Sequence, residues 1–493
     1  MRILLIDPPF ERFQGIRRGF FPLGAASVGA ALSRAGHQVR IYDGEQDNDS
    51  RVISYAGAQR VYQLYLDGLK NREHPVWREI RGIISDESPD LLGISCLTVK
   101  FDSAVIIAEM AREIFPELPV VFGGIHPTLL PAQVLARKEV NFVIRGEGEE
   151  TFQELALALE QKKGFAAIPG LSYKKEDRVI HNPDRPHIGK LDELPFPGRH
   201  LLSNDRQYHH EDLGLIMGSR GCPFACTYCA SNKVWTRKVR YRSAENIVRE
   251  IEKVHRQYGT SQFSLEDDSF TVNRKLVHKF CDQLDKRGLK IKWSAITRIN
   301  LLTEEIIDRM RRSGLNHLRV GIESGSDRIL QYTRKGLTVE DIRKGARVIR
   351  KSGIYWSAYF MLGLPAETVE DIRKTVRLME EIKPDYCTLS IFTPYPGTVI
   401  FDELLAQGKV SGDMDWSRFS HGSPYNHFSE KIEDFQDIAG YAASAVDRYN
   451  GNFFRIFRRA RSKASIYLAS PGEFTQDVKR YLSWRFTRVE KSR

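Results

Sequence analysis

Three cysteines lie close together in the segment Cys222-Pro-Phe-Ala-Cys226-Thr-Tyr-Cys229. The chain has only six cysteines in 493 residues, too few for a disulfide scaffold, and such a cluster is typical of a metal or catalytic site. A structural zinc ion would need a fourth protein ligand, and no Cys or His follows at zinc-finger spacing; His209 and His210 precede the cluster. The spacing therefore favours an iron–sulfur cluster, with a zinc or purely structural role as the alternative.

A [4Fe-4S] cluster held by three thiolates has one iron without a protein ligand. That iron can bind a small molecule through an amine and a carboxylate, and S-adenosylmethionine (SAM) is the ligand that fits this chemistry. A reduced cluster can pass an electron to the sulfonium, which cleaves a carbon–sulfur bond and leaves a primary carbon radical. The chemistry predicted for this loop is therefore the reductive cleavage of SAM.

The residues around the cysteines strengthen this prediction. A short apolar run at 213–217 leads through Gly218-Ser-Arg-Gly221 directly into the first cysteine. A strand, a glycine turn and three cysteines in succession resemble the signature of the radical SAM superfamily. Tyr228, immediately before the last cysteine, matches the aromatic position of that signature. The resemblance implies that the three cysteines ligate the cluster and that Tyr228 lies near the adenine of SAM.

The first 164 residues alternate strand and helix patterns. Strands are expected at 3–6, 39–42, 91–97, 120–122 and 142–144, with helices at 23–35, 103–114 and 149–159. Continuous apolar strands that alternate with helices predict a doubly wound, mainly parallel α/β sheet of the Rossmann or flavodoxin type. Such sheets bind ligands at the carboxyl ends of their strands.

Two motifs follow strands of this predicted sheet. Ser95 and Leu97 form a Ser-x-Leu motif, and after 25 intervening residues Gly123-Gly124 follows, two positions before His126. Paired glycines let a large flat ligand approach the backbone, although a tight turn is the alternative. The combination resembles the cobalamin-binding domain, which implies that the serine region holds the nucleotide tail and the glycines line its channel. The family's Asp-x-His-x-x-Gly motif is missing, so we expect no histidine from that loop beneath cobalt; His126 is the nearest alternative, and a structural hydrogen bond is its other interpretation.

A second series of strands and helices follows the cysteines. Strands are expected at 213–217, 262–265, 292–296, 317–322, 356–361 and 387–392, and the helices between them are expected to end at Gly259, Gly288, Gly314 and Gly353. Thr303 and Thr338 are expected N-caps. Six parallel units predict an open, partial (β/α)6 barrel.

Polar and flexible residues follow the ends of these strands, where barrel enzymes place their chemistry. They resemble, strand by strand, the barrel of radical SAM enzymes that carry an N-terminal cobalamin domain. The candidate SAM contacts are Asp267, Asp268, Glu323, Ser324, Gly363 and Pro365. The resemblance places Asp267 and Asp268 near the amine of SAM, Glu323 and Ser324 near its ribose or carboxylate, and Gly363 and Pro365 near its adenine. Capping of the next helix is the alternative for the acidic pair, and glycines at 321 and 325 would allow close approach beside Glu323. Ala366 stands where the family usually has glycine.

The C-terminal region differs in charge from the rest of the chain. The net charge is +11, and residues 451–493 contribute eleven Lys or Arg and three Asp or Glu, a net +8. The remainder is nearly neutral, which argues against a nucleic-acid surface over the whole protein. A basic amphipathic helix at 453–461 is interpreted as a surface helix whose aromatics pack on the barrel, with membrane-surface, nucleic-acid or partner binding as the alternatives. A helix at 432–449 is expected to cap the barrel opening. No apolar run approaches the roughly 18–20 residues that span a bilayer, so we expect a cytoplasmic protein with possible membrane association.

We therefore expect four regions: a cobalamin-binding domain at 1–164, a hairpin and proline-rich linker at 165–202, a partial radical SAM barrel at 203–400, and a helical C-terminal region at 401–493. The resemblance implies a cobalamin-dependent radical SAM enzyme that methylates an unactivated carbon by means of a 5′-deoxyadenosyl radical and methylcobalamin. It also implies a flavodoxin- or ferredoxin-type electron donor and a small-molecule or lipid-like substrate.

Three alternatives remain open. A radical cyclase or rearrangement enzyme, similar to the anaerobic porphyrin cyclases, would use the same cofactors. A tRNA methylthiotransferase would need three N-terminal cysteines, whereas only Cys96 precedes the cluster. A corrinoid-binding protein without catalysis would not need the three clustered cysteines.

Overall fold

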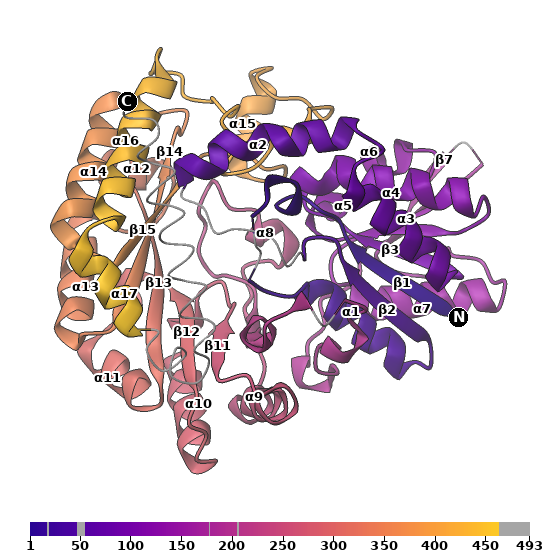
Figure 1. The fold of residues 1–493 in the computed structure, drawn as a ribbon, viewed down its shortest axis with the longest axis horizontal. Coiled ribbons are helices and arrows are strands. Elements are labelled where there is room, and N and C mark those ends of the chain that lie inside the picture. Colours follow the sequence, from indigo (N-terminus) through magenta and orange to yellow (C-terminus); the bar gives the residue numbers. More distant parts are fainter. Residues whose placement is uncertain (17–18, 47–54, 177, 205–206, 463–493) are drawn as a thin grey trace. The chain divides into compact units, whose positions relative to one another are not determined.

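The computed structural model describes residues 1–16, 19–46, 55–176, 178–204 and 207–462. The chain divides into two compact units (Figure 1). The first comprises residues 1–48, 63–260 and 394–420, and the second comprises residues 49–62, 261–393 and 421–493.

The first unit is built on a seven-stranded sheet with the order β2-β1-β3-β4-β5-β6-β7. The strands are β1 Arg2–Asp7, β2 Gln38–Asp43, β3 Leu91–Ser95, β4 Val120–Gly123, β5 Phe142–Ile144, β6 Leu171–Lys175 and β7 Arg178–His181. Strands β1 to β5 are parallel, and the predicted hairpin β6–β7 extends the sheet in antiparallel fashion. The order 2-1-3-4-5 is flavodoxin-like, so the ligand crevice of such a sheet lies between the ends of β1 and β3, where the winding direction reverses. The doubly wound α/β prediction is confirmed.

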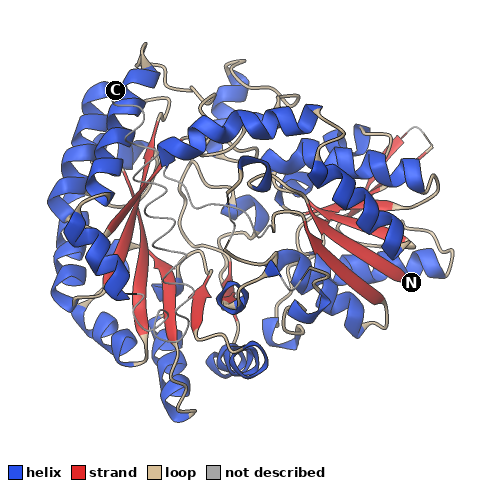
Figure 2. Cartoon of the chain, in the orientation of Figure 1, coloured by secondary structure: helices blue, strands red, loops and turns tan. Residues whose placement is uncertain are grey.

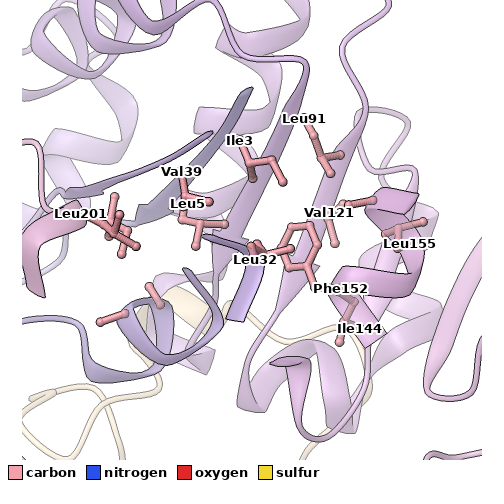
Figure 3. Packing of buried hydrophobic residues seen from close by; sticks show 14 of the residues in the cluster. Ile3, Leu5, Leu32, Val39, Leu91, Val121, Ile144, Phe152, Leu155 and Leu201 are labelled. Atoms are coloured by element: carbon pink, nitrogen blue, oxygen red, sulfur yellow. The ribbon is translucent and has the colours of Figure 1, made fainter. Parts of the chain in front are cut away.

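Helices cover both faces of this sheet (Figure 2). They are α1 Leu23–Arg34, α3 Pro75–Glu87, α4 Phe101–Ile114, α5 Ile125–Leu129, α6 Pro131–Ala136 and α7 Gly148–Glu160; a further helix, α2 Tyr55–Lys70, is divided between the two units. Figure 3 shows one core, in which Ile3 and Leu5 of β1 pack with Leu32 of α1 and Phe152 of α7. Because both faces are covered, β1, β3, β4 and β5 are buried along most of their length and do not alternate.

The first unit also contains the chain around the cysteines. Its elements there are β8 Leu215–Ile216, β9 Ser219–Arg220, α8 Ser231–Val234, β10 Arg240–Tyr241 and α9 Ala244–Tyr258, and α15 Val399–Ala406 is added from further along the chain. The Ser243 hydroxyl caps α9, and Gly259 closes it in the left-handed conformation with a φ of 74°.

The second unit contains the parallel strands β11 Gln262–Leu265, β12 Lys292–Thr297, β13 Leu315–Glu323, β14 Tyr355–Leu362 and β15 Tyr386–Ile391, in the order β15-β14-β13-β12-β11. Its helices are α10 Arg274–Lys286, α11 Glu304–Arg312, α12 Asp327–Tyr332, α13 Val339–Ser352, α14 Val369–Ile382, α16 Phe435–Asn450 and α17 Phe453–Ser462. Thr303 and Thr338 cap α11 and α13, as predicted. Each of the six segments predicted to be strands after residue 203 contains one.

Burial alternates along β11, β12 and β15 and along most of β13. In β15, Cys387, Leu389 and Ile391 are buried, whereas the residues between them are half-buried and polar. The buried residues form one apolar face of the sheet, and the other face is lined by hydroxyl and charged groups. A sheet covered by helices on one face only is what a partial barrel requires.

The C-terminal helices differ from two expectations. Helix α16 packs against α14 and β15, so the prediction that it caps the barrel opening is wrong. In α17, Arg458 Nε lies 3.0 Å from Asp385 Oδ1 and the Arg459 guanidinium lies over the Tyr386 ring, whereas Phe454 is 77% exposed. Arginines face the unit, not the aromatics that we expected. The rest of the basic tail, residues 463–493, lies outside the described residues. No helix in the described part of the chain is long and apolar enough to cross a membrane.

Candidate functional site

The carboxyl ends of β3 and β4 form an open apolar edge of the first sheet. Ser95 ends β3 half-buried, and Leu97 and Ile125 are both 40% exposed. A Cβ built on Gly123 would meet no atom within 4 Å, whereas one on Gly124, with a φ of +105°, would lie 2.8 Å from the Cys96 carbonyl oxygen. Gly124 therefore lets the loop after β4 touch the loop after β3, and Gly123 leaves space beside these loops. An open backbone flanked by exposed apolar side chains fits a large flat ligand such as a corrin.

His126 lies inside the protein and not at this edge. Its ring is fully buried, with centroids 4.7 Å from the Phe101 ring and 5.3 Å from the Trp416 ring. Within the described part of the chain, neither ring nitrogen has a hydrogen-bond partner. Burial lowers the pKa of His126 to about 3, against a smaller opposing effect of the Gln133 side chain, so the ring is neutral.

The cysteine loop begins where β9 pairs with β10. Gly221 has a φ of +105°, and a Cβ there would lie 2.9 Å from the Lys238 carbonyl oxygen, so only glycine permits this turn. Cys222 and Cys226 are half-buried and Cys229 is exposed, and none of the three forms a disulfide. Tyr228 is half-buried between the last two cysteines.

This donor set suits a cluster better than a single ion. Among the described residues, no three His, Cys, Asp or Glu side chains are gathered as a single metal ion would require. A [4Fe-4S] cluster needs one thiolate on each of three different irons, and three cysteines in one loop, none of them in a disulfide, meet that demand.

The half-buried Arg220 and the buried Arg240 tie the cysteine loop to α7. Arg220 Nη1 lies 2.5 Å from Glu147 Oε1, and its Nη2 lies 2.5 Å from Glu149 Oε1. Arg240 Nη1 is 2.8 Å from Glu147 Oε2. Burial opposes ionisation of Glu147, but Arg220 and Arg240 lower its pKa overall. The residue directly before the Gly221 turn is thus fixed to the start of α7, a contact that our sequence reading missed because its partners lie 73 residues apart.

A second buried network holds the strand that precedes the loop. Glu250 accepts hydrogen bonds from Arg199, at 2.9 Å, and from Arg242, at 2.6 Å. The same arginines donate to backbone carbonyls of this strand and its ends, with Arg199 bonding Leu215 and Arg242 bonding Met217. The predicted linker, 165–202, therefore contributes Arg199 to the support of β8.

In the second unit, the acids after β11 have different surroundings. Asp267 is buried and Asp268 is exposed, whereas Glu266 pairs with Arg319 of β13 at 2.8 Å. The next α-helix, α10, is capped by Asn273. The alternative that Asp267 or Asp268 caps this helix is therefore wrong.

Glu323 ends β13 with a φ of +69° and pairs with Lys335 at 2.7 Å. A Cβ on Gly321 would lie 2.5 Å from the Glu323 carboxylate, and one on Gly325 would lie 2.5 Å from the backbone of α14. These glycines make room for the ion pair and for a neighbouring helix. Ser324 is fully buried, and its Oγ accepts a hydrogen bond from the Ser326 N–H.

The loop after β14 is held by its own acid. Gly363, with a φ of +85°, donates its N–H to Glu367 Oε2 at 2.6 Å. Burial raises the pKa of Glu367 to about 8, against the lowering effect of that hydrogen bond, so the side chain is largely neutral at pH 7. Pro365 is buried, and its carbonyl accepts from the Glu430 N–H. Ala366 does not have a positive φ, so alanine is tolerated in place of the family's glycine.

Comparison with known proteins assigns the family. The model of the radical SAM superfamily matches residues 216–379, and that of the B12 binding domain matches residues 19–156. An uncharacterized methyltransferase from Pyrococcus horikoshii is 32% identical over 443 residues, covering 88% of this chain and 90% of that protein. The chain belongs to the cobalamin-binding radical SAM enzymes.

Two further relatives extend this assignment. The anaerobic magnesium-protoporphyrin IX monomethyl ester cyclase of Rubrivivax gelatinosus is 30% identical over 412 residues, covering 82% of this chain and 70% of the cyclase. The radical SAM methyltransferase TsrM from Kitasatospora setae, with tryptophan and a SAM analogue bound, has the same fold, with a TM-score of 0.69 at 18% identity over 90% of this chain and 89% of TsrM. A further TsrM structure holds cobalamin and a [4Fe-4S] cluster. The cofactors of this radical SAM family member are a [4Fe-4S] cluster, SAM and cobalamin.

Proposed function

We propose that this enzyme methylates an unactivated carbon of a small molecule. The observation that carries the proposal is that one compact unit contains both the cysteine loop and the open edge at β3 and β4, with Arg220 joining the loop to Glu147 and Glu149 at the start of α7. Methyl transfer needs both cofactors, and the P. horikoshii relative, which is described as a methyltransferase, shares nearly the whole chain.

The chain's own residues have distinct proposed roles. Cys222, Cys226 and Cys229 would each hold one iron and leave the fourth iron for SAM. When bound, these cofactors supply an electron for SAM cleavage and a methyl group for transfer. The residues at the edge of the first sheet (Ser95, Leu97, Gly123 and Gly124) would hold cobalamin, and His126 would support the loop from within.

For SAM, the buried Asp267 carboxylate suits an amine, and the Glu323–Lys335 pair offers both an acceptor and a donor. The loop of Gly363 and Pro365, fixed by Glu367, offers a rigid apolar wall for the adenine. Ser324 would act indirectly, by fixing the chain after Glu323. We propose Asp268 and Tyr228 as further contacts because both are accessible.

Methyl-labelled SAM tests the reaction class without knowledge of the substrate. The protein is reconstituted anaerobically with iron, sulfide and cobalamin, reduced, and mixed with SAM carrying a ¹³C methyl group. Methyl transfer predicts ¹³C-methyl on the extracted cobalamin together with S-adenosylhomocysteine. Formation of 5′-deoxyadenosine without any label on cobalamin would instead support a cyclase, the second candidate, which the similarity to the R. gelatinosus enzyme favours.

The same samples address the remaining alternatives. A tRNA methylthiotransferase would hold a second cluster, but only Cys96, which is buried, precedes Cys222. Iron and sulfide for one cluster per chain are therefore expected. A corrinoid-binding protein without catalysis would form no product from SAM.

A flavodoxin- or ferredoxin-type protein is our proposed electron donor. The exposed Cys229 places one ligand of the cluster at the surface of the loop, where a small redox protein can approach. Replacing the chemical reductant by flavodoxin, its reductase and NADPH tests this donor, and SAM cleavage should continue. For α17 we favour a docked surface helix over a membrane anchor, because Arg458 and Arg459 contact Asp385 and Tyr386.

A further inference from the structure

The same seven residues, Thr-Val-Glu-Asp-Ile-Arg-Lys, begin two helices of the second unit. They are residues 338–344 at the start of α13 and residues 368–374 at the start of α14. Both copies form the same capping box, in which the threonine hydroxyl accepts the N–H of the aspartate and the aspartate accepts the N–H and the hydroxyl of the threonine. The local sequence explains this cap in both helices, so a further role of either copy must come from its other contacts.

The aspartate of the second copy also holds the loop that follows β13. Asp371 Oδ1 accepts the Ser326 hydroxyl at 2.6 Å, and its Oδ2 pairs with the Arg328 guanidinium. Asp371 is only 3% exposed. In the first copy Asp341 is half-buried, and within the described part of the chain its hydrogen bonds all join it to Thr338. Two aspartates with the same local sequence therefore differ in their contacts with the rest of the fold.

One turn further along α14, Thr375 holds the same loop. Its Oγ1 accepts the Gly325 N–H at 2.9 Å and lies 3.3 Å from the Ser324 hydroxyl. A Cβ on Gly325 would lie 2.5 Å from the Lys374 carbonyl oxygen, so only glycine lets the loop pack this closely on α14. The equivalent position of α13 is Gly345, which has no hydroxyl to offer. The acceptor for the Gly325 N–H is thus a feature of α14 and not of the repeated sequence.

The loop that follows β14 is joined to the same helix. Residues 363–367 lead directly into α14. The Arg328 Nη2 that pairs with Asp371 also donates to the Ala366 carbonyl of this loop, at 2.8 Å. The loops after β13 and β14 carry the residues that we propose as contacts of the ribose or carboxylate of SAM and of its adenine. Asp371 and Thr375 thus mount both halves of that contact set on one helix.

We propose that Asp371 and Thr375 are positioning residues for SAM, which hold the loop after β13 and the loop after β14 in one arrangement on α14. The inference rests on the SAM contacts of the proposed function, but not on which reaction follows SAM binding. A ligand that must order its own binding loops binds more weakly than one that meets loops already fixed. Loss of either side chain should therefore lower the affinity for SAM.

SAM binding to the full-length, cluster-loaded protein tests this role, and without a reductant no SAM is cleaved. Thr375→Val keeps the shape of the side chain but leaves the buried Gly325 N–H without its acceptor. We expect the affinity for SAM, measured by anaerobic titration calorimetry, to fall about tenfold in this variant. Thr375→Ser should restore it. Asp371→Asn, which removes the charge that pairs with Arg328, should lower the affinity by a similar factor. The iron content should stay at the wild-type value in all three variants.

Asp341→Asn is the matched control, because it changes the same residue of the same seven-residue sequence and disturbs the same kind of capping box. It should leave the affinity for SAM unchanged. Equal losses of affinity in Asp341→Asn and Asp371→Asn would show that helix capping alone is responsible and would overturn the proposal. Wild-type affinity in both Asp371→Asn and Thr375→Val would overturn it as well.

Hydrogen–deuterium exchange of the protein without cofactors tests the contact itself. Peptides that cover residues 321–330 should exchange faster in Thr375→Val and Asp371→Asn than in the wild type, whereas Asp341→Asn should not change them. Unchanged exchange in the first two variants would overturn the proposal even if their affinity for SAM fell. A cluster-loaded wild type that binds no SAM would also overturn it. A wild type that binds SAM but transfers no methyl group would count against the proposed function only.

Discussion

Along β1, residues Ile3 to Asp7 are all buried, whereas along β15 buried and half-buried residues alternate from Tyr386 to Ile391. The first sheet has helices on both faces and leaves only the ends of its strands for a ligand. The second has one apolar face under helices and one polar face, so it can line a reaction space. The two sheets thus differ in the burial pattern of their strands: β1 is buried from both sides, whereas β15 has one buried face and one partly exposed face.

The largest effect is expected when the ion-pair network that holds the cysteine loop is broken at Arg220. Arg220→Met leaves Glu149 and part of Glu147 as buried charges without this partner, and breaking a buried pair costs about 3–5 kcal/mol. We expect a loss of that size in the unfolding free energy measured by urea denaturation, together with reduced iron incorporation.

Arg81→Met is the matched control, because it breaks an equally short but exposed pair with Glu113. An exposed pair contributes about 1 kcal/mol or less. Equal losses for the two variants would show that the Arg220 network does not fix the cysteine loop in the way we describe.

At the carboxyl ends of β3 and β4, two neighbouring glycines distinguish an effect on stability from an effect on cobalamin binding. Gly124→Ala forces an L-residue to a φ of +105° against the Cys96 carbonyl, which should cost at least about 1–2 kcal/mol of stability. Gly123→Ala meets no protein atom, so its stability should stay within about 0.5 kcal/mol of wild type. Its methyl group would enter the space assigned to cobalamin, so cobalamin affinity, measured by absorbance titration, should fall. Wild-type affinity in Gly123→Ala would contradict this placement of the ligand.

In the second unit, two acids at the start of α14 predict opposite pH dependences: Glu367 precedes the helix, and Asp371 lies in its first turn. Because the pKa of Glu367 is about 8 in the folded protein and 4.5 ordinarily, its contribution to stability is complete below pH 4.5 and is lost as pH rises through 8. Glu367→Gln should therefore flatten the fall in melting temperature between pH 5 and 8.

Asp371 is the contrasting case. Burial opposes its ionisation, but hydrogen bonds from Ser326 and Thr368 and the Arg328 guanidinium lower its pKa to about 2. Its contribution is present above its ordinary pKa of 3.8 and is lost as pH falls through 2. Asp371→Asn should lower the melting temperature at neutral pH and have little effect near pH 2. If Glu367→Gln and Asp371→Asn showed the same dependence of melting temperature on pH, our account of these two acids would be wrong.

The smallest effect is expected on α17. Phe454 and Phe457 are 77% and 61% exposed, so changing both to Ser should alter stability by less than about 0.5 kcal/mol. If α17 is a docked surface helix, the full-length wild type and the double variant should show the same flotation with anionic liposomes. Flotation of the wild type that is lost in the double variant would establish membrane contact.

The sequence predicted the features that depend on local chemistry. The four expected helix ends at glycine, the N-caps at Thr303 and Thr338, and the cysteine loop depend on residues within a few positions of each other. The strand patterns were equally informative, because burial on one or both faces leaves its own periodicity.

Long-range pairs were not predictable in this way. Asp371 and Ser326 are 45 residues apart, and a single sequence shows only that both are polar. Likewise, the amphipathic pattern of α17 predicted a helix, but an arginine that stacks on Tyr386 has the same pattern as one in solvent. Glycines beside Glu323 predicted space, but not that its own carboxylate and α14 occupy it.

The most direct test of the central claim is cluster-dependent cleavage of SAM. Wild type, a Cys222→Ala/Cys226→Ala/Cys229→Ala variant, and a control with Cys281→Ala in the core are reconstituted anaerobically and assayed for iron, sulfide and 5′-deoxyadenosine. We predict one [4Fe-4S] cluster and SAM cleavage in the wild type and the control, and neither in the triple variant. A triple variant that keeps its iron, or a wild type that binds zinc and leaves SAM intact, would contradict the account.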